Sequence, residues 1–402
     1  MKLPRDPASR IAFALVTLGA LFLAWTAISG VRAGAYSDYL AEWHEVLAGH
    51  DPWRPHPGVP LNAYGPLFNV VALLAWLDPI APKLLFAASY IAFVAWLVVW
   101  RTADRTVRQR QAVLALCLLN PFPWIEIAHF GFFDVLVGIA CAAAIHATRR
   151  GDDRLSGALV GLGVLVKFLP IVILPVLACA GRRLRFDLIG GAAVVALAGM
   201  TASLATWGPS TLDPLRFAAG RSPVMSIYDL LGSPDSPLWL GLRFDLGQLE
   251  KPLIVGSEAM LLVWCWWRKA GPAVCALLAV LVILLFYRSG YNNYQMMPFC
   301  LLAYAFAAAT DEFRMTRGLL LALCAYLAAL AAIDAGFPVI RRIASSDAAT
   351  LYLDGCYLAR WLAGCTLVGA IMAATRAFPA DDHPNTNLGP ALPPAPAASS
   401  LL

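Results

Sequence analysis

Long apolar runs separated by short polar segments fill almost the whole chain. Runs of roughly 17–22 apolar residues are long enough to cross a bilayer as α-helices. The pattern predicts an all-α, polytopic integral membrane protein with about ten transmembrane helices and some shorter re-entrant or juxtamembrane helices. The spans are expected at about 11–31, 83–100, 112–128, 131–148, 187–207, 252–267, 271–287, 296–310, 317–335 and 355–375.

Two further apolar segments are interrupted, so we do not expect either of them to cross as one straight helix. A proline-containing break ends the run at 65–80, which predicts a short helix dipping in from the outer side. The segment 155–180 carries Lys167 and Pro170 in its middle and basic residues on both flanks. It predicts two half-helices that meet near Lys167 and re-enter from the cytoplasm. A single straight span is the alternative, and it would invert the topology of everything that follows.

Basic residues in the short loops give the expected orientation. The N-terminus and the loops around 101–110, 149–154 and 182–185 are basic. We therefore expect these loops and both termini in the cytoplasm, whereas Arg341 and Arg342 lie in an expected outer loop and depart from the rule.

One transmembrane domain is expected over residues 1–375, with two large outer loops at 32–64 and 208–250. Residues 376–402 are rich in Pro, Ala, Ser and Asn and are expected to form a disordered cytoplasmic tail.

Composition supports the membrane class and excludes some functions. Hydrophobic residues make up 60% of the 402 residues, charged residues only 14%, and the mean hydropathy is +0.69, whereas soluble domains carry about 25% charged residues. The sequence contains no basic tract with interleaved aromatic residues, so nucleic-acid binding is not expected. The nine cysteines lie mostly in apolar runs without metal-ligand spacing, so we expect them to be small packing residues. We predict no cofactor and no metal site.

The first large outer loop opens with an amphipathic pattern. Apolar residues recur at helical spacing over 36–47, and Asp38, Glu42 and Glu45 share the opposite face. We therefore predict a helix lying in the outer interface of the membrane. Glu42 and Glu45 are expected to belong simply to a solvated polar face.

Four groups of motifs occur in the order of a known family. They are Ser37-Asp38-Tyr39 with Leu47–Trp53 and Tyr64-Gly65-Pro66-Leu67, then Asn120-Pro121 with His129–Asp134, then a glycine-rich segment ending at Lys167 and Pro170, and last Tyr291-Asn292-Asn293-Tyr294 with Pro298. Together they resemble the polyprenyl-phosphate-sugar-dependent glycosyltransferases of GT-C fold, and most of all glycosyltransferase family 87 and its mannosyltransferase relatives. The resemblance covers about residues 10–310.

The resemblance implies an inverting transfer of a sugar, mannose by family default, from a polyprenyl-phosphate-sugar donor to a lipid or glycan acceptor. The reaction would take place on the outer face of the inner membrane, with membrane lipids as further partners. Asp38 would be the general base that deprotonates the acceptor hydroxyl. Tyr39 stands where some relatives have a second acid, which argues against a metal clamp there, and Phe132 stands where many have Gln.

The departing polyprenyl phosphate needs positive charge or hydrogen-bond donors around it. The resemblance offers Lys167, His129 and Arg288 for this role. Each has an alternative: Lys167 could snorkel to the cytoplasm, Arg288 could be a plain interfacial anchor, and His129 could be an ordinary loop histidine.

Tyr64, Asp134, Asn293 and Tyr294 complete the set of candidate donor-binding residues. An interfacial aromatic belt is the more common role for such tyrosines, and capping of the following helix is favoured for Asp134. For the site to exist, the hairpin at His129–Asp134, the break at Lys167 and the late outer turn must converge on the first outer loop.

Two other classes of protein are alternatives to a glycosyltransferase. A transporter or flippase of a lipid-linked envelope precursor should show inverted repeats and acidic residues in mid-span, but the acids cluster in outer loops and no repeat is visible. An acyltransferase or ligase would need an outer His or Ser nucleophile in a triad, and no such pattern occurs. The enzyme is therefore favoured.

Overall fold

The computed structural model describes residues 6–31, 35–102, 105–234, 236, 238–241 and 245–378. Helices form the regular structure of these residues, beside two isolated β-bridges, so the all-α prediction is confirmed. Beyond Phe378, the tail expected to be disordered lies outside the described residues.

In the first half of the chain, the described residues form ten α-helices and the shorter π- and 3-10 segments between them. In chain order these are α1 (Pro7–Ser29), α2 (Ala35–Leu47), α3 (Pro66–Val70), α4 (Ala72–Leu77), α5 (Ala81–Ala95), η1 (Trp96–Arg101), α6 (Val107–Leu118), α7 (Pro121–Pro123), η2 (Trp124–His129), α8 (Asp134–Arg149), α9 (Asp153–Val166), η3 (Leu169–Val172), α10 (Ile173–Cys179) and η4 (Ala180–Arg182).

The second half is likewise made of α-helices with short π- and 3-10 segments between them. Its elements are α11 (Phe186–Trp207), η5 (Gly208–Leu212), α12 (Asp213–Gly220), α13 (Ile227–Gly232), η6 (Leu246–Leu249), α14 (Glu250–Arg268), α15 (Pro272–Phe286), η7 (Asn292–Gln295), α16 (Met296–Ala308), α17 (Arg317–Ala331), η8 (Ala332–Gly336), α18 (Phe337–Ile343) and α19 (Ser346–Ala374).

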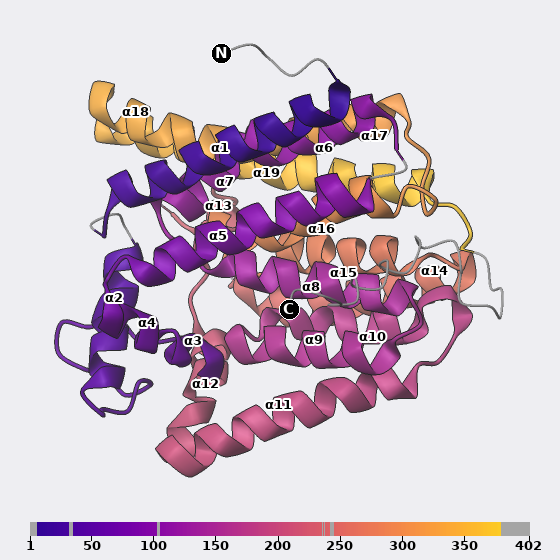
Figure 1. Cartoon of the computed structure of the whole chain (residues 1–402). Coiled ribbons are helices and arrows are strands. Elements are labelled where there is room, and N and C mark those ends of the chain that lie inside the picture. The colour runs from indigo at the N-terminus through magenta and orange to yellow at the C-terminus, as the bar shows by residue number, and fades with distance from the viewer. Residues whose placement is uncertain are drawn as a thin grey trace, which may run out of the picture.

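The long helices lie side by side, while α2, α3, α4 and α12 gather at one end of the molecule (Figure 1). α15 and α16 are almost wholly buried, and α9 packs between α8 and α11. The peripheral helices α1 and α11 expose large apolar side chains such as Ile28 and Val194. That distribution is expected of helices whose outer face contacts lipid.

Six helices among the described residues are long and apolar enough to cross a membrane. They cover Ala8–Ser29, Ala81–Arg101, Val107–His129, Phe186–Ala218, Arg317–Ile343 and Ser346–Ala374. The protein is therefore a multi-pass membrane protein, and the count of about ten spans stays a prediction. Pro66–Leu77, in the interrupted run at 65–80, forms a shorter apolar helical segment made of α3 and α4. The predicted short helix is therefore confirmed, and its entry into the membrane from the outer side stays a prediction.

The segment 155–180 folds as a helical hairpin. α9 ends at Lys167, whose backbone is extended (φ −153°, ψ 135°), and η3 and α10 continue the chain. Arg185 Nη1 lies 2.8 Å from Asp153 Oδ1, and Arg154 Nε lies 3.3 Å from Asp187 Oδ1, so both flanks lie at the same end of the molecule. The predicted pair of half-helices is confirmed, and the alternative of a single straight span is wrong.

One end of the bundle, which we call the basic end, collects the segments 149–154, 180–187, 268–271, 309–317 and 374–378. Two of the loops predicted to be cytoplasmic, around 149–154 and 182–185, lie there. There Arg149 pairs with Asp311 at 2.9 Å and with Glu312. Arg182 Nε donates to the carbonyl of Trp266 at 2.8 Å. We call the opposite end, which carries α2, η2, Lys167, α12 and η7, the site end.

The hairpin can be tested by topology reporters. Fusions after Gly151 and after Arg183 should report the same side of the membrane, and a fusion after Gly58 should report the other side. The reason is that the paired flanks of α9 and α10 leave no crossing between the first two points. Alkaline phosphatase and green fluorescent protein activities provide the measurement. Opposite sides for Gly151 and Arg183 would contradict the fold.

Candidate functional site

A buried ion pair joins segments that are far apart in the sequence. Lys167, at the break after α9, pairs with Asp134 at the start of α8. Asn293 in η7 donates through Nδ2 to the second Asp134 oxygen at 3.0 Å. Lys167 is 8% exposed and Asp134 is 2% exposed. The hairpin, the helix break and the late outer turn therefore converge as predicted.

Backbone packing brings the first outer loop to the same place. The Gly65 amide donates to the carbonyl of Val166, the last residue of α9, at 3.1 Å. A Cβ on Gly65 would lie only 2.2 Å from the carbonyl oxygen of Leu165, so no other residue fits without a shift of the backbone. This close approach places Tyr64 next to Lys167.

A cavity of about 300 Å³ lies beside the ion pair. Its walls come from the first outer loop, the break after α9, α12, α14, α15 and η7. The lining residues are Ala63, Tyr64, Lys167, Phe168, Leu169, Val172, Pro214, Phe217, Ala218, Arg221, Ile254, Ile283, Tyr287 and Tyr294. Two cations stand among mostly apolar side chains, an arrangement that suits an amphiphile with an anionic group.

Aromatic rings hold both cations in the cavity. Lys167 Nζ lies 3.7 Å from the centroid of the Tyr294 ring. The Arg221 guanidinium lies 4.7 Å from the Tyr291 ring and donates through Nη2 to the Tyr291 hydroxyl at 2.7 Å. Cation–π contacts of this kind stabilise a partly desolvated charge. Because Lys167 pairs with Asp134 at the site end, the alternative of a lysine snorkelling to the cytoplasm is wrong.

The favoured role of Asp134 as a helix cap is also wrong. Phe133 is the N-cap residue of α8, and no side chain caps that end of the helix. The Asp134 carboxylate instead accepts hydrogen bonds from Lys167 and Asn293. A buried carboxylate needs an opposite charge and hydrogen-bond donors, and that requirement outweighs a cap.

An aromatic cluster of Tyr39, Tyr64, Phe68 and Phe133 connects α2 with the ion pair. The ring centroids of Tyr64 and Phe133 lie 4.8 Å apart, and those of Tyr39 and Phe133 lie 5.5 Å apart. Tyr64 and Tyr294 both line the cavity, so neither serves as a plain belt residue. The cluster fixes α2 above the cavity wall.

The helix predicted in the first outer loop forms as α2, but the solvated role expected for Glu42 is wrong. Glu42 is 4% exposed, and its Oε2 has no hydrogen-bond partner among the described residues. Positions 39, 42 and 43 share one face of a helix, and that face is covered by the aromatic cluster. Burial, together with the smaller effect of the nearby charge of Asp38, raises the pKa of Glu42 to about 8.

Asp38 lies on the first turn of α2 and is exposed. A carboxylate in the first turn interacts favourably with the helix dipole. Asp38 is not among the residues that line the cavity. Its neighbour Tyr39 packs on Tyr64, with ring centroids 5.6 Å apart, and so links the turn that carries Asp38 to the cavity wall.

Arg288 and His129 lie apart from the cavity wall. Arg288 pairs with Glu250 and donates through Nη1 to the carbonyl of Arg221 at 2.7 Å, so it anchors the 208–250 loop. The backbone carbonyl of His129 accepts a hydrogen bond from Lys83 Nζ at 2.6 Å. The structure therefore does not bring these two side chains together with Lys167.

Sequence reasoning missed Arg221 and a second polar network. Arg221 belongs to the long outer loop, where no motif marks it. In the network, Asn292 Nδ2 donates to Asp334 Oδ1 at 2.6 Å, and Arg360 Nη1 donates to Asn292 Oδ1 at 3.3 Å. Charged residues inside apolar helices are the signal that could have found Asp334 and Arg360.

The fold and site define a multi-pass membrane protein with a cationic, largely apolar cavity at one end. Glycosyltransferase family 87 matches residues 62–289, more than half of the chain, so the protein belongs to this family and is a glycosyltransferase. The matched region includes Tyr64, Asp134 and Lys167, and it begins after Asp38.

A search of curated proteins found no match. Among solved structures, the chain is similar to that in "Crystal Structure of ArnT from Cupriavidus metallidurans bound to Undecaprenyl phosphate". The two are 16% identical with a TM-score of 0.48, over 89% of this chain and 77% of that chain.

Burial of Glu42 predicts a pH dependence of stability. The folded protein holds a proton on Glu42 up to a pKa of about 8, whereas the ordinary value is 4.5. Between these two values the unfolded chain releases a proton that the folded chain keeps, so stability falls as the pH rises. Glu42→Gln should flatten the decline of the apparent Tm in detergent between pH 5 and pH 9.

Asp187→Asn, at an exposed acid of the basic end, should keep the wild-type slope and serves as the control. Equal slopes for wild type and Glu42→Gln would contradict the burial of an uncompensated carboxyl group.

Proposed function

We propose that the protein transfers a sugar, mannose by family resemblance, from a polyprenyl-phosphate-sugar donor to a lipid or glycan acceptor. The observation that carries this proposal is the cavity at the site end, in which two cations stand among apolar walls in a member of glycosyltransferase family 87. A phosphate needs positive charge, and a prenyl chain needs apolar contacts.

The cavity divides into parts that match the parts of such a donor. Lys167 and Arg221 supply positive charge. Leu169, Val172 and Ile283 supply apolar surface suited to the first isoprene units. Tyr64 and Tyr294 supply ring faces on which a sugar can pack. A volume of about 300 Å³ accommodates a phosphate and part of a sugar or chain, not the whole lipid.

Lys167 has two tasks in this proposal. Its pair with Asp134 holds the helix break in place, and its remaining hydrogens can reach a phosphate in the cavity. An ammonium group has three donors, so one carboxylate does not exhaust it. Lys167→Ala should weaken the use of the donor, but it also leaves Asp134 buried without its cation, so Arg221 gives the cleaner test.

In the proposed reaction Asp38 is the base, and Lys167 and Arg221 face the leaving group. The Asp38 carboxylate removes the proton of the acceptor hydroxyl, and the oxygen attacks the anomeric carbon of the donor sugar. The bond from this carbon to the phosphate oxygen breaks, and polyprenyl phosphate leaves as an anion. Lys167 and Arg221 stabilise the charge that develops on it. One displacement inverts the anomeric configuration.

The orientation of the molecule in the membrane completes the proposal. Basic loops collect at the end opposite the site, and the positive-inside rule assigns such loops to the cytoplasm. The site then opens on the outer face of the inner membrane, where a lipid-linked donor and a lipid or glycan acceptor can both be reached. A transporter or flippase receives no support from the family match.

Asp38→Asn should reduce sugar transfer by about 10²–10⁴-fold, because the amide cannot accept the acceptor proton. Transfer is measured in isolated membranes that are supplied with radiolabelled polyprenyl-phosphate-mannose, and the product is identified by lipid-linked sugar profiling against a deletion strain. Asp187→Asn should be fully active at equal abundance. Wild-type turnover by Asp38→Asn would remove Asp38 from the mechanism.

Arg221→Gln should raise the KM for the lipid-linked donor by about tenfold to a hundredfold, the loss of one charge-assisted hydrogen bond. Arg216→Gln is a matched control, because Arg216 lies on α12, the helix that ends just before Arg221, but is exposed and pairs with Asp213. An unchanged KM in a folded Arg221→Gln protein would contradict the assignment of the phosphate to this cavity.

A further inference from the structure

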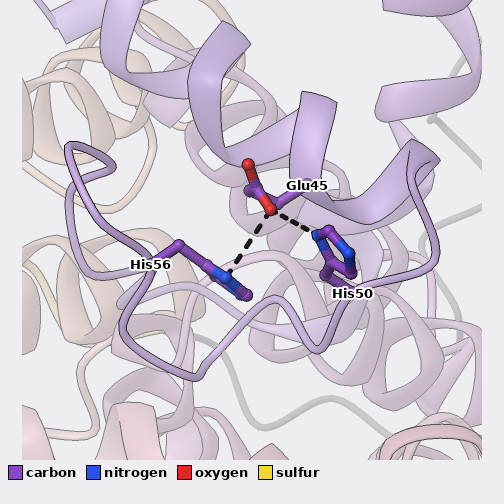
Figure 2. A group of neighbouring side chains, drawn as sticks. All are labelled: Glu45, His50 and His56. Atoms are coloured by element: carbon purple, nitrogen blue, oxygen red, sulfur yellow. Dashed lines mark hydrogen bonds and ion pairs between the residues drawn. The ribbon is translucent and has the colours of Figure 1, made fainter.

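Three side chains suited to metal binding meet at the end of α2, outside the cavity. Glu45 lies in the last turn of α2, and His50 and His56 point toward it from the loop that follows (Figure 2). Nδ1 of His50 lies 2.6 Å from Glu45 Oε2, and Nδ1 of His56 lies 3.6 Å from the same oxygen. The three ligand atoms all lie within 4.8 Å of one another.

These separations are close to those in a zinc site. Zinc binds imidazole nitrogen and carboxylate oxygen at about 2.0–2.2 Å with tetrahedral geometry, which places neighbouring ligand atoms about 3.3 Å apart. Small side-chain rotations that move the ligand atoms by about one ångström or less would bring all three atoms to this spacing. The two histidines are separated by five residues, a spacing common between the histidines of zinc sites.

The hydrogen bonding of His56 leaves its Nδ1 available as a metal ligand beside Glu45. Nε2 of His56 lies 3.0 Å from the carbonyl oxygen of Asp51. A carbonyl only accepts, so Nε2 carries a hydrogen, and the tautomer with its hydrogen on Nε2 presents the Nδ1 lone pair toward the Glu45 carboxylate. Two lone-pair atoms that face each other need a metal ion or a proton between them. Metal-bound histidines usually donate their other N–H to a carbonyl or carboxylate in this way.

The loop is built to present these ligands. The His50 amide donates to the Glu45 carbonyl at 3.0 Å, which closes the loop on the end of α2. Pro52 and Pro55 restrict the backbone between the two histidines. The side chains of His50, His56 and Glu45 are 58%, 22% and 19% exposed, so an ion can enter from solvent.

We propose that Glu45, His50 and His56 bind one Zn²⁺, with water as the fourth ligand, and that the ion fixes the first outer loop. Trp53 lies between the two histidines in sequence, is 1% exposed, and donates through Nε1 to the carbonyl of Tyr64 at 3.0 Å. An ion that holds the loop therefore holds the backbone of a residue that lines the cavity. The role is one of positioning, and the ion takes no part in the transfer step.

This site is separate from the position of Tyr39, where the sequence argues against a metal clamp because some relatives have a second acid there. Imidazole nitrogen with one carboxylate suits zinc better than magnesium or calcium, which take mostly oxygen ligands. When zinc binds, the proton between His50 Nδ1 and Glu45 leaves Nδ1, so the nitrogen can bind the metal.

The test uses the full chain, purified in detergent without an oligohistidine tag, stripped with a chelator and titrated with zinc chloride. Elemental analysis should find about one zinc per chain in the wild type, and zinc should raise the apparent Tm by several degrees. His50→Gln and His56→Gln should each bind at least tenfold less zinc and lose the shift in Tm. His44→Gln, at an exposed histidine of α2, should behave as the wild type.

Cobalt provides a readout that needs no variant. Added to stripped wild type, Co²⁺ should give the visible absorption bands of a tetrahedral site, and zinc should abolish them. The proposal is overturned if stripped wild type binds no zinc and gives no cobalt bands, since a shared proton then explains the cluster. It is equally overturned if folded His50→Gln and His56→Gln bind zinc as the wild type does.

Discussion

The pair of Lys167 and Asp134 is the interaction on which the whole site end depends. Removing one partner of a buried pair leaves an uncompensated charge and costs about 3–5 kcal/mol, and the surroundings of Lys167 offer little water. Lys167 must therefore sit where Asp134, Asn293 and the Tyr294 ring can all reach it. That requirement fixes the break after α9 against the start of α8 and against η7.

The aromatic cluster extends this constraint to the first outer loop. Tyr64 and Phe133 pack on each other beside the pair, and Tyr39 carries the contact to α2. The same rings exclude water from Glu42, which is why its carboxyl group keeps a proton at neutral pH. Asp38, one turn earlier on the same helix, stays exposed. Two carboxyl groups four residues apart thus differ in exposure to solvent because the aromatic cluster covers only one of them.

Much of the fold could be predicted because the relevant signals are local. Apolar length and basic flanks identified the helices, and the flanks of 155–180 favoured a hairpin with Lys167 at its break over a single straight span. The amphipathic pattern of α2 was equally clear. The site residues were predicted only in part. Five of them do come together: Lys167, Asp134, Asn293, Tyr64 and Tyr294. Arg288 instead anchors a loop through Glu250, and His129 also lies apart from the cavity wall.

The sequence by itself determined which segments are helical and where one of them is broken. These properties depend on the apolar length of each segment and on the charges at its flanks. Only the tertiary structure decided that Asp134 pairs with Lys167 rather than capping α8, that Glu42 is covered, and that Arg221 reaches the cavity. The partner and the solvent exposure of an ionisable group are set by surfaces that pack on it from distant parts of the chain.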